Sequence, residues 1–374
     1  MNSVILSDRP TTGDPMLLVR AQDRSPGLLH GSLAYRRASL ALFLAGFATF
    51  SLLYCVQPLL PAFAATYHVS AGASSLALSL TTGALAVAIF ASGALSQSLP
   101  RRGLMFGSML LAGICNLLAA VAPGWTWLLF DRFVEGAVLG GVPAVAMAWL
   151  AEEMHPRDLG KAMGLYVAGT AFGGMAGRIG MGLLLDVSTW QVAMAAMGAA
   201  GIAAAIGFAL LLPPSRGFVV QRGFGLHTHK RLWARHLRHR DLRRLFVVGF
   251  LLTGVFVTLF NYAGFRLSAV PFSLGPTAIS LVFLSYISGM IVSPWAGQLA
   301  DRVGRRAPLA ASLLVMAAGV LVTLSDALPL IVLGILLVTL GFFAAHAIVS
   351  CPLLSGPSTM TVWTKEGTTN ASKE

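Results

Sequence analysis

The chain has 374 residues, of which 56% are hydrophobic and 11% charged, against roughly 45–50% and about 25% in soluble domains. A mean hydropathy of +0.77 excludes a water-soluble protein with a single core. The net charge of +12 does not indicate nucleic-acid binding, because the positive residues stand in short runs between apolar segments. Three cysteines without paired spacing argue against a disulfide framework or a metal site. We therefore expect an all-α membrane protein.

Ten apolar segments are long enough to cross a bilayer, which takes roughly 20 helical residues. They are 39–59, 73–95, 104–122, 126–150, 162–185, 190–212, 245–265, 277–299, 307–325 and 327–350. Residues 1–38 are polar and lack the apolar stretch of a signal peptide, so we expect a disordered cytosolic arm. Residues 39–212 would form an N-terminal six-helix bundle, and residues 245–350 a C-terminal bundle of four helices.

Lysine and arginine set the orientation, since these residues are retained on the cytosolic side. With the N-terminus inside, all of the 26 Lys and Arg except Arg132, Arg178 and Arg266 fall in cytosolic segments. The basic stretch 213–244 between the two bundles also carries four histidines. We interpret it as a linker on the anionic inner leaflet, the alternative being a nucleic-acid or metal site.

Two short segments of the chain are similar to each other. Gly93, Arg101 and Arg102 stand 204 residues before Gly297, Arg305 and Arg306, and each segment lies between two apolar stretches. A constant offset over half the chain indicates two structurally equivalent halves, which is typical of secondary transporters.

Several motifs give a specific resemblance. The segment 297–306 reads G-x-L-A-D-R-x-G-R-R and resembles the signature between the second and third helices of each half in the major facilitator superfamily; Gln97 and Pro100 weaken the first copy. Residues 132–136 resemble the fourth-helix R-x-x-x-G motif, and residues 169–174 the antiporter motif G-P-x-x-G-G, with threonine in place of proline. The resemblance, closest to arabinose-efflux-permease-like and drug-efflux proteins, implies a multi-pass protein of the bacterial inner membrane with two six-helix bundles.

The family has twelve spans and this sequence offers ten. After Val349 the residues 351–374 are polar and interrupted by proline and glycine. We expect that the reading frame or gene is truncated here and that the last two helices are missing. The alternative is a genuine ten-span carrier.

The fourth span contains Asp131, Arg132 and Glu135. At ~1.5 Å per residue from position 125, Arg132 lies about 10 Å deep and Glu135 about 15 Å. A lone charge there costs at least ~2.5–3.5 kcal/mol, and a spacing of three residues lets Arg132 and Glu135 neutralise each other. We interpret the group as a proton-coupling site, since small rearrangements change the proton affinity of a buried carboxylate. A static pair that ties helices together is the alternative.

The fifth span combines a glycine series with an arginine. Glycines at 169, 173 and 177, with another at 174, allow close approach of a neighbouring helix. Gly169, Gly173, Gly174 and Gly177 would form either a hinge or a packing surface. Arg178 could meet an anionic substrate, extend to the outer surface or pair with Asp186.

The duplicated loops predict a cytosolic gate. Asp301 could accept hydrogen bonds from helix-end amides, and arginines could bind carboxylates or helix-end carbonyls across the cytosolic face. The gate residues would be Gly93, Arg101, Arg102, Gly297, Asp301, Gly304, Arg305 and Arg306. Orientation by the positive-inside rule alone is the alternative.

Polar residues within apolar spans predict a substrate pocket. Tyr54 and Gln57 stand late in the first span, and Asn261 and Tyr262 stand at the equivalent place in the seventh. Asn116 and His346 are further candidates. A cavity lined from both halves fits this symmetry, and ordinary interhelical hydrogen bonds are the alternative.

Together these features predict a proton-coupled exporter of small organic molecules that works by alternating access. Its partners would be the lipid bilayer, a small-molecule substrate and protons, and we expect a monomer without nucleic acid, metal or cofactor. The sequence has no P-loop, zinc-ligand cluster or nucleophile elbow, so we expect no enzyme. The alternatives are a proton-linked importer and a non-transporting truncated remnant or scaffold.

Overall fold

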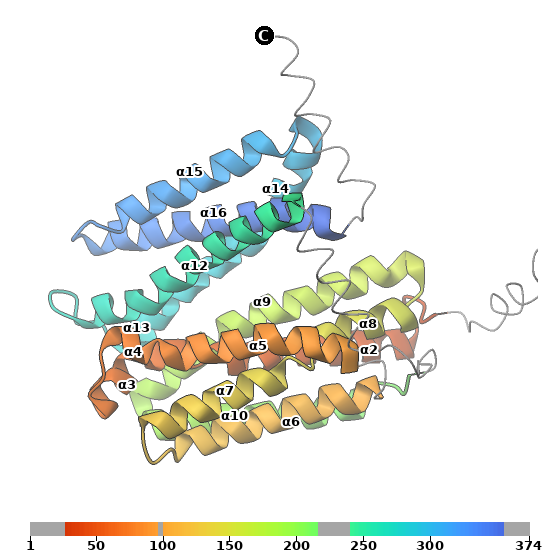
Figure 1. Ribbon diagram of the computed structural model, residues 1–374, viewed down its shortest axis with the longest axis horizontal. Coiled ribbons are helices and arrows are strands. Elements are labelled where there is room, and N and C mark those ends of the chain that lie inside the picture. The colour runs from red at the N-terminus through yellow and green to blue at the C-terminus, as the bar shows by residue number, and fades with distance from the viewer. Residues whose placement is uncertain (1–26, 96–99, 216–239, 355–374) are drawn as a thin grey trace, which may run out of the picture.

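The computed structural model describes residues 27–95, 100–215 and 240–354, and these ranges are almost wholly helical (Figure 1). Most of the predicted arm, Gln97 of the first loop copy, most of the basic linker and residues 355–374 of the predicted tail lie outside the described residues.

The N-terminal group of helices comprises α2 (Leu33–Tyr54), η1 (Gln57–Leu59), α3 (Leu60–Tyr67), α4 (Ala71–Ser74), α5 (Leu76–Leu95), α6 (Arg101–Ala120), α7 (Trp125–Leu139), α8 (Pro143–Glu153), α9 (Pro156–Val187) and α10 (Trp190–Leu211). The C-terminal group comprises α12 (Arg240–Ser268), α13 (Pro276–Leu281), η2 (Val282–Leu284), α14 (Ser285–Val303), α15 (Arg306–Val322) and α16 (Leu328–Leu354).

All ten predicted apolar segments are helical. Eight helical segments of the described residues are long and apolar enough to cross a membrane. The two others are α15, which has 17 residues, and α9, which has 32 residues but whose glycines and Arg178 lower its hydropathy.

Several boundaries differ from the prediction. Helix α2 begins at Leu33, inside the predicted arm, because the Ser32 side chain caps it by accepting a hydrogen bond from the Tyr35 amide at 3.1 Å. Helix α12 begins at Arg240, inside the predicted linker. The fourth span is divided into α7 and α8 at residues 140–142, where Gly140 lies against the backbone of α5.

The last part of the predicted disordered arm is ordered. The Leu28 amide donates to the Glu153 carbonyl at 2.7 Å, and the His155 amide donates to the Leu28 carbonyl at 3.2 Å. The His30 amide donates to Asp158 Oδ2 at 2.9 Å. These bonds hold residues 27–32 against the turn between α8 and α9, which corrects the arm prediction for residues 27–38.

The two groups repeat one packing scheme. In the N-terminal group α5 packs against α7, and in the C-terminal group α14 packs against α16, so the second and fourth spans pair in both. In addition, α2 packs against α9 and α10 against α6. This agreement is what the duplicated loops predict.

The two groups meet mainly at one end. The C-terminal part of α9 packs against α13, and α12 packs against η1 and α3. In Figure 1 the groups come together on the left, near α3 and α13, and the ribbons diverge to the right. With the orientation predicted from the lysine and arginine distribution, the meeting end is the outer one.

Candidate functional site

The contact between the two groups contains a polar pair. Gln57, the first residue of η1, donates from Nε2 to Oδ1 of Asn261 on α12 at 2.6 Å. Both side chains are buried, with exposures of 3% and 5%. The pair therefore joins the two helix groups through the positions that the sequence predicts for a pocket.

Arg178 on α9 adjoins this pair. Its Nε donates to Gln57 Oε1 at 2.5 Å, and its Nη1 donates to the Gly174 carbonyl at 2.6 Å. The residue is 2% exposed, so it does not extend to the outer surface. Nor does it pair with Asp186, whose Oδ2 accepts from the Thr277 amide at 3.3 Å. Neither the outer surface nor Asp186 is thus the partner of Arg178 here, and contact with an anionic substrate stays a prediction.

Three aromatic rings surround the guanidinium. Its central carbon lies 4.0 Å from the ring centre of Tyr54, 4.9 Å from that of Phe283 and 5.1 Å from that of Tyr286. The first ring comes from α2 and the other two from η2 and α14, so both groups contribute. The prediction missed Phe283 and Tyr286, although a tyrosine inside an apolar span was a usable signal.

Tyr262 does not join this cluster. It is 43% exposed and packs against Phe265 at 6.1 Å between ring centres. One residue along a helix turns the side chain by about 100°, so Tyr262 and Asn261 point in different directions. His346 stacks on Phe342, one turn before it on α16. A pocket role of Tyr262 and of His346 stays a prediction.

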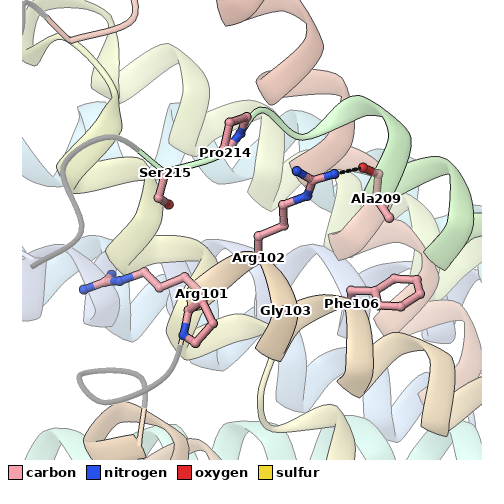
Figure 2. Close-up of a pocket in the computed structure, with 8 residues that line it drawn as sticks. Arg101, Arg102, Gly103, Phe106, Ala209, Pro214 and Ser215 are labelled. Carbon is pink, nitrogen blue, oxygen red and sulfur yellow. Dashed lines mark hydrogen bonds between the residues drawn. The ribbon is translucent and has the colours of Figure 1, made fainter. Parts of the chain in front are cut away.

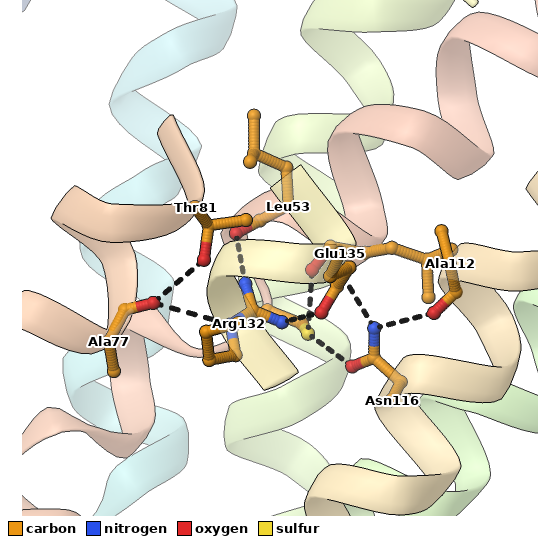
Figure 3. A network of polar contacts seen from close by, with 9 residues as sticks. Leu53, Ala77, Thr81, Ala112, Asn116, Arg132 and Glu135 are labelled. Carbon is orange, nitrogen blue, oxygen red and sulfur yellow. Dashed lines mark hydrogen bonds and ion pairs between the residues drawn. The ribbon is translucent and has the colours of Figure 1, made fainter. Parts of the chain in front are cut away.

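A second polar site lies inside the N-terminal group. The ion pair that the spacing predicts is present: Arg132 Nη1 donates to Glu135 Oε2, and both side chains are completely buried. Figure 3 shows Asn116 on the other side of Glu135, donating from Nδ2 to Oε1 at 2.7 Å. The remaining donors of Arg132 reach the Ala77 carbonyl from Nε at 3.2 Å and the Leu53 carbonyl from Nη2 at 3.1 Å.

This network draws on four helices. The carbonyls come from α2 and α5, the amide from α6 and the ion pair from α7. Gly136, one turn after Arg132, lies against the Thr81 carbonyl, one turn after Ala77. A side chain at 136 would separate α7 from α5 and withdraw the arginine from its acceptor. The R-x-x-x-G spacing of Arg132 and Gly136 therefore follows from the packing of α7 on α5, which needs the glycine so that the arginine can reach its acceptor.

Asp131 is the third predicted coupling residue. It is 4% exposed, and its Oδ2 makes no hydrogen bond to the described residues. Asp131 stands one turn before Glu135 and so shares its face of α7, while it is turned by about 100° from its neighbour Arg132. A part in proton coupling stays a prediction for this residue.

The glycine series of α9 lies against α2. A Cβ at Gly169 would lie 2.5 Å from the Phe43 carbonyl oxygen, and one at Gly177 would lie 2.7 Å from the Ser51 Cα. Gly173 lies against Phe47 in the same way, and Ser51 Oγ donates to the Gly173 carbonyl at 2.8 Å. Helix α9 is continuous through the series. The structure thus shows packing at these positions, and a hinge stays a prediction.

The first of the duplicated loops forms contacts within its own group. Arg101, at the start of α6, binds Glu152 Oε1 near the end of α8 at 2.5 Å. Arg102 donates to the Ala209 carbonyl in the last turn of α10. Figure 2 shows the surrounding cavity of about 510 Å³, which is also lined by Phe106 and Pro214.

The second loop is more exposed. Asp301 is 3.7 Å from Arg305 Nη2, one turn along, and 62% of its side chain is exposed. Gly304 ends α14 with φ +81°, a left-handed conformation that suits glycine. Arg306 is exposed at the start of α15, while Gly93 and Gly297 lie in the last turns of α5 and α14. The described ion pairs of both loops stay within one helix group.

Comparison with known proteins identifies the family. The sequence pattern of the Major Facilitator Superfamily matches residues 42–361. The MFS-type transporter YybF of Bacillus subtilis is 41% identical over 320 residues, which are 86% of this chain and 79% of that protein. The inner membrane transport protein YnfM of Escherichia coli is 42% identical over 277 residues, 74% of this chain and 66% of that protein.

Solved structures give the same fold. A bacterial homologue of the human lysosomal transporter Spinster, in an inward-facing and unoccupied conformation, superposes with a TM-score of 0.69 at 17% identity; the match covers 86% of this chain and 75% of that one. The membrane-spanning helices, the matched pattern and the relatives agree. The chain belongs to the major facilitator superfamily.

Proposed function

We propose that the protein is a proton-coupled exporter of small organic molecules in the bacterial inner membrane, working as a monomer by alternating access. The observation that carries the proposal is the buried Arg132–Glu135 pair. Asn116 is a neutral neighbour of this carboxylate, so Arg132 supplies the compensating charge among the described contacts of Glu135. Moving the guanidinium by a few ångströms would leave Glu135 uncompensated, and such a carboxylate takes up a proton.

The contacts between the helix groups support alternating access. They concentrate at the end that we assign to the outside, so the groups would be open towards the cytosol. In the opposite state the cytosolic ends would approach each other. Arg101, Arg102, Asp301, Arg305 and Arg306 would then bind across the gap instead of within their own group. The inward-facing Spinster homologue supports the same assignment.

Export, rather than import, is supported by the glycine series. Its likeness to an antiporter motif is joined by a structural role, because Gly169, Gly173 and Gly177 hold α9 closely against α2. Tight packing of α9 would limit proton leakage beside the substrate path, which coupling requires in either direction, so the direction rests on the likeness to the antiporter motif.

The test is flux in everted vesicles under an imposed pH gradient, with ethidium as a cationic substrate and a panel of organic acids beside it. We expect the gradient to accelerate transport by the native chain. Glu135→Gln should transport at one rate with or without the gradient, because glutamine keeps the size and loses the titration. Asp326→Asn is the matched control, since Asp326 is fully exposed. Unchanged proton dependence in Glu135→Gln would refute the coupling site. No flux of any substrate would favour a non-transporting membrane protein.

A further inference from the structure

Arg178 is a buried cation without a described counter-ion. Among the described residues, its hydrogen bonds go to the Gln57 side-chain oxygen and the Gly174 carbonyl, and no ion pair involves it. Arg132, equally buried, has Glu135. An unneutralised charge in a membrane protein is costly, and such residues mark substrate paths or ligand counter-ions.

The guanidinium of Arg178 has hydrogen-bond donors that the described residues do not use. Arginine has five N–H groups in a planar fork. The described bonds use Nε and Nη1, and Nη2 makes no hydrogen bond to the described residues. The two N–H groups of Nη2 are therefore available to an acceptor. A carboxylate or sulfonate fits best, because it accepts from this fork and supplies the missing negative charge.

The surroundings suit an organic molecule more than a small inorganic ion. Tyr54, Phe283 and Tyr286 place aromatic rings around the guanidinium, at 4.0 to 5.1 Å from its central carbon. The rings attract the cation electrostatically and so lower the cost of burying it, but they do not neutralise its charge as a counter-ion would. They also offer apolar faces to the body of a ligand whose charged group binds the arginine.

We propose that Arg178 is the anion-binding residue of the transport site and that the substrates are organic anions with an apolar or aromatic body. The inference rests on the proposed transport function and adds the substrate class. Because Arg178 and Tyr54 belong to one helix group and Phe283 and Tyr286 to the other, a bound anion would contact both groups. Its arrival or departure would change the contact on which alternation depends.

The test compares matched pairs of molecules that differ in charge. Binding to the detergent-solubilised full chain is measured by calorimetry for benzoate and benzamide, for naphthalene-2-sulfonate and its sulfonamide, and for the trimethylphenylammonium cation. We expect each anion to bind at least tenfold more tightly than its neutral partner. Because this comparison uses the native chain, it holds even if a variant fails to fold.

Three variants locate the effect. Arg178→Gln should remove the preference for anions, and Arg178→Lys should keep part of it, because lysine retains the charge and loses the fork. Arg157→Gln, at the exposed start of the same helix, should bind as the native chain does. A monodisperse elution profile confirms that each variant is folded.

Two results overturn the inference: neutral or cationic compounds that bind the native chain as tightly as the anions do, or an anion preference that survives in folded Arg178→Gln. Absence of anion binding to the native chain does the same. Ethidium flux without anion binding would leave the transport function standing and the substrate class refuted. Arg178-dependent anion binding without flux of any substrate would refute the transport function, and the anions would then be ligands of the site rather than transported substrates.

Discussion

Gln57 and Asn261 form a 2.6 Å hydrogen bond, and they are separated by 204 residues. The same offset relates Gly93 to Gly297 in the duplicated loops. Gln57 and Asn261 are therefore counterparts in the two halves. Equivalent residues can contact each other only close to the axis that relates their halves. The hydrogen bond marks the pseudo-two-fold axis at the contact between the helix groups.

This position predicts a state-dependent crosslink. With Gln57→Cys and Asn261→Cys in a background without native cysteines, a short bifunctional methanethiosulfonate should join the two helix groups and stop transport. Reduction should restore it. The pair Arg101→Cys and Arg305→Cys, at the opposite ends of the same groups, should crosslink only when the cytosolic ends close. Efficient transport by the crosslinked Gln57–Asn261 pair would contradict the assigned movement.

The buried ion pair predicts strongly non-additive stabilities. Arg132→Met leaves Glu135 buried without its cation, which should lower the free energy of unfolding by about 3–5 kcal/mol. Adding Glu135→Leu should recover much of that loss, because the stranded charge is gone. Unfolding in mixed detergent, followed by circular dichroism, measures both. The effect of Glu135→Leu on the free energy of unfolding is therefore measured both in the native chain and in Arg132→Met. Equal effects in the two backgrounds would show that the two side chains are independent.

The contact between α9 and α2 predicts opposite effects of one substitution at two glycines. Gly173→Ala should destabilise the protein by about 1–3 kcal/mol, because the methyl group meets the Phe47 backbone. Gly180→Ala, two turns on, meets no described atom within 4 Å, and should be neutral or stabilise by up to about 1 kcal/mol. Thermal unfolding of the two variants gives the comparison. Equal melting temperatures would show that α9 and α2 are not in close contact.

The orientation predicts which ends of α9 face which side. Lys161 and Val187 are both exposed, near opposite ends of this helix. In a cysteine-free background, an impermeant maleimide added to intact cells should label Val187→Cys. Lys161→Cys should react only after the membrane is permeabilised. The reverse pattern would place the N-terminus outside and invert the assignment of the gate.

Much of the fold follows from local sequence. About twenty apolar residues in a row form a helix inside a bilayer, because each backbone polar group there needs a partner within the segment. The spacing of Arg132 and Glu135 puts them together on any helix. The direction of Arg178 does not follow in this way, because its three rings come from distant parts of the chain, one from α2 and two from segments about 105 positions later. The direction of Tyr262 does not follow from local sequence either, because the face that α12 presents depends on its packing. The arm prediction was wrong for residues 27–38 because polar composition does not reveal backbone partners such as Glu153 and His155.

Helix α9 packs against α2 on one face and against α13 on another, and the two contacts differ in how easily the neighbouring helix can move along α9. Towards α2 the glycines bring the two backbones into direct contact, so α9 and α2 would move together as one rigid body. Towards α13 two neighbours are small hydroxyl residues, with Ser280 against Gly182 and Thr277 beside Asp186. Nearer the middle of α9, Met175 and Ile179 pack with Ile279 and Phe283 in one apolar cluster. Only the part around Gly182 can therefore slide without moving bulky side chains past one another. The C-terminal helices would therefore rotate about this outer third of α9 during alternating access. A bulky residue at position 182 would block that rotation without disturbing the packing within either helix group.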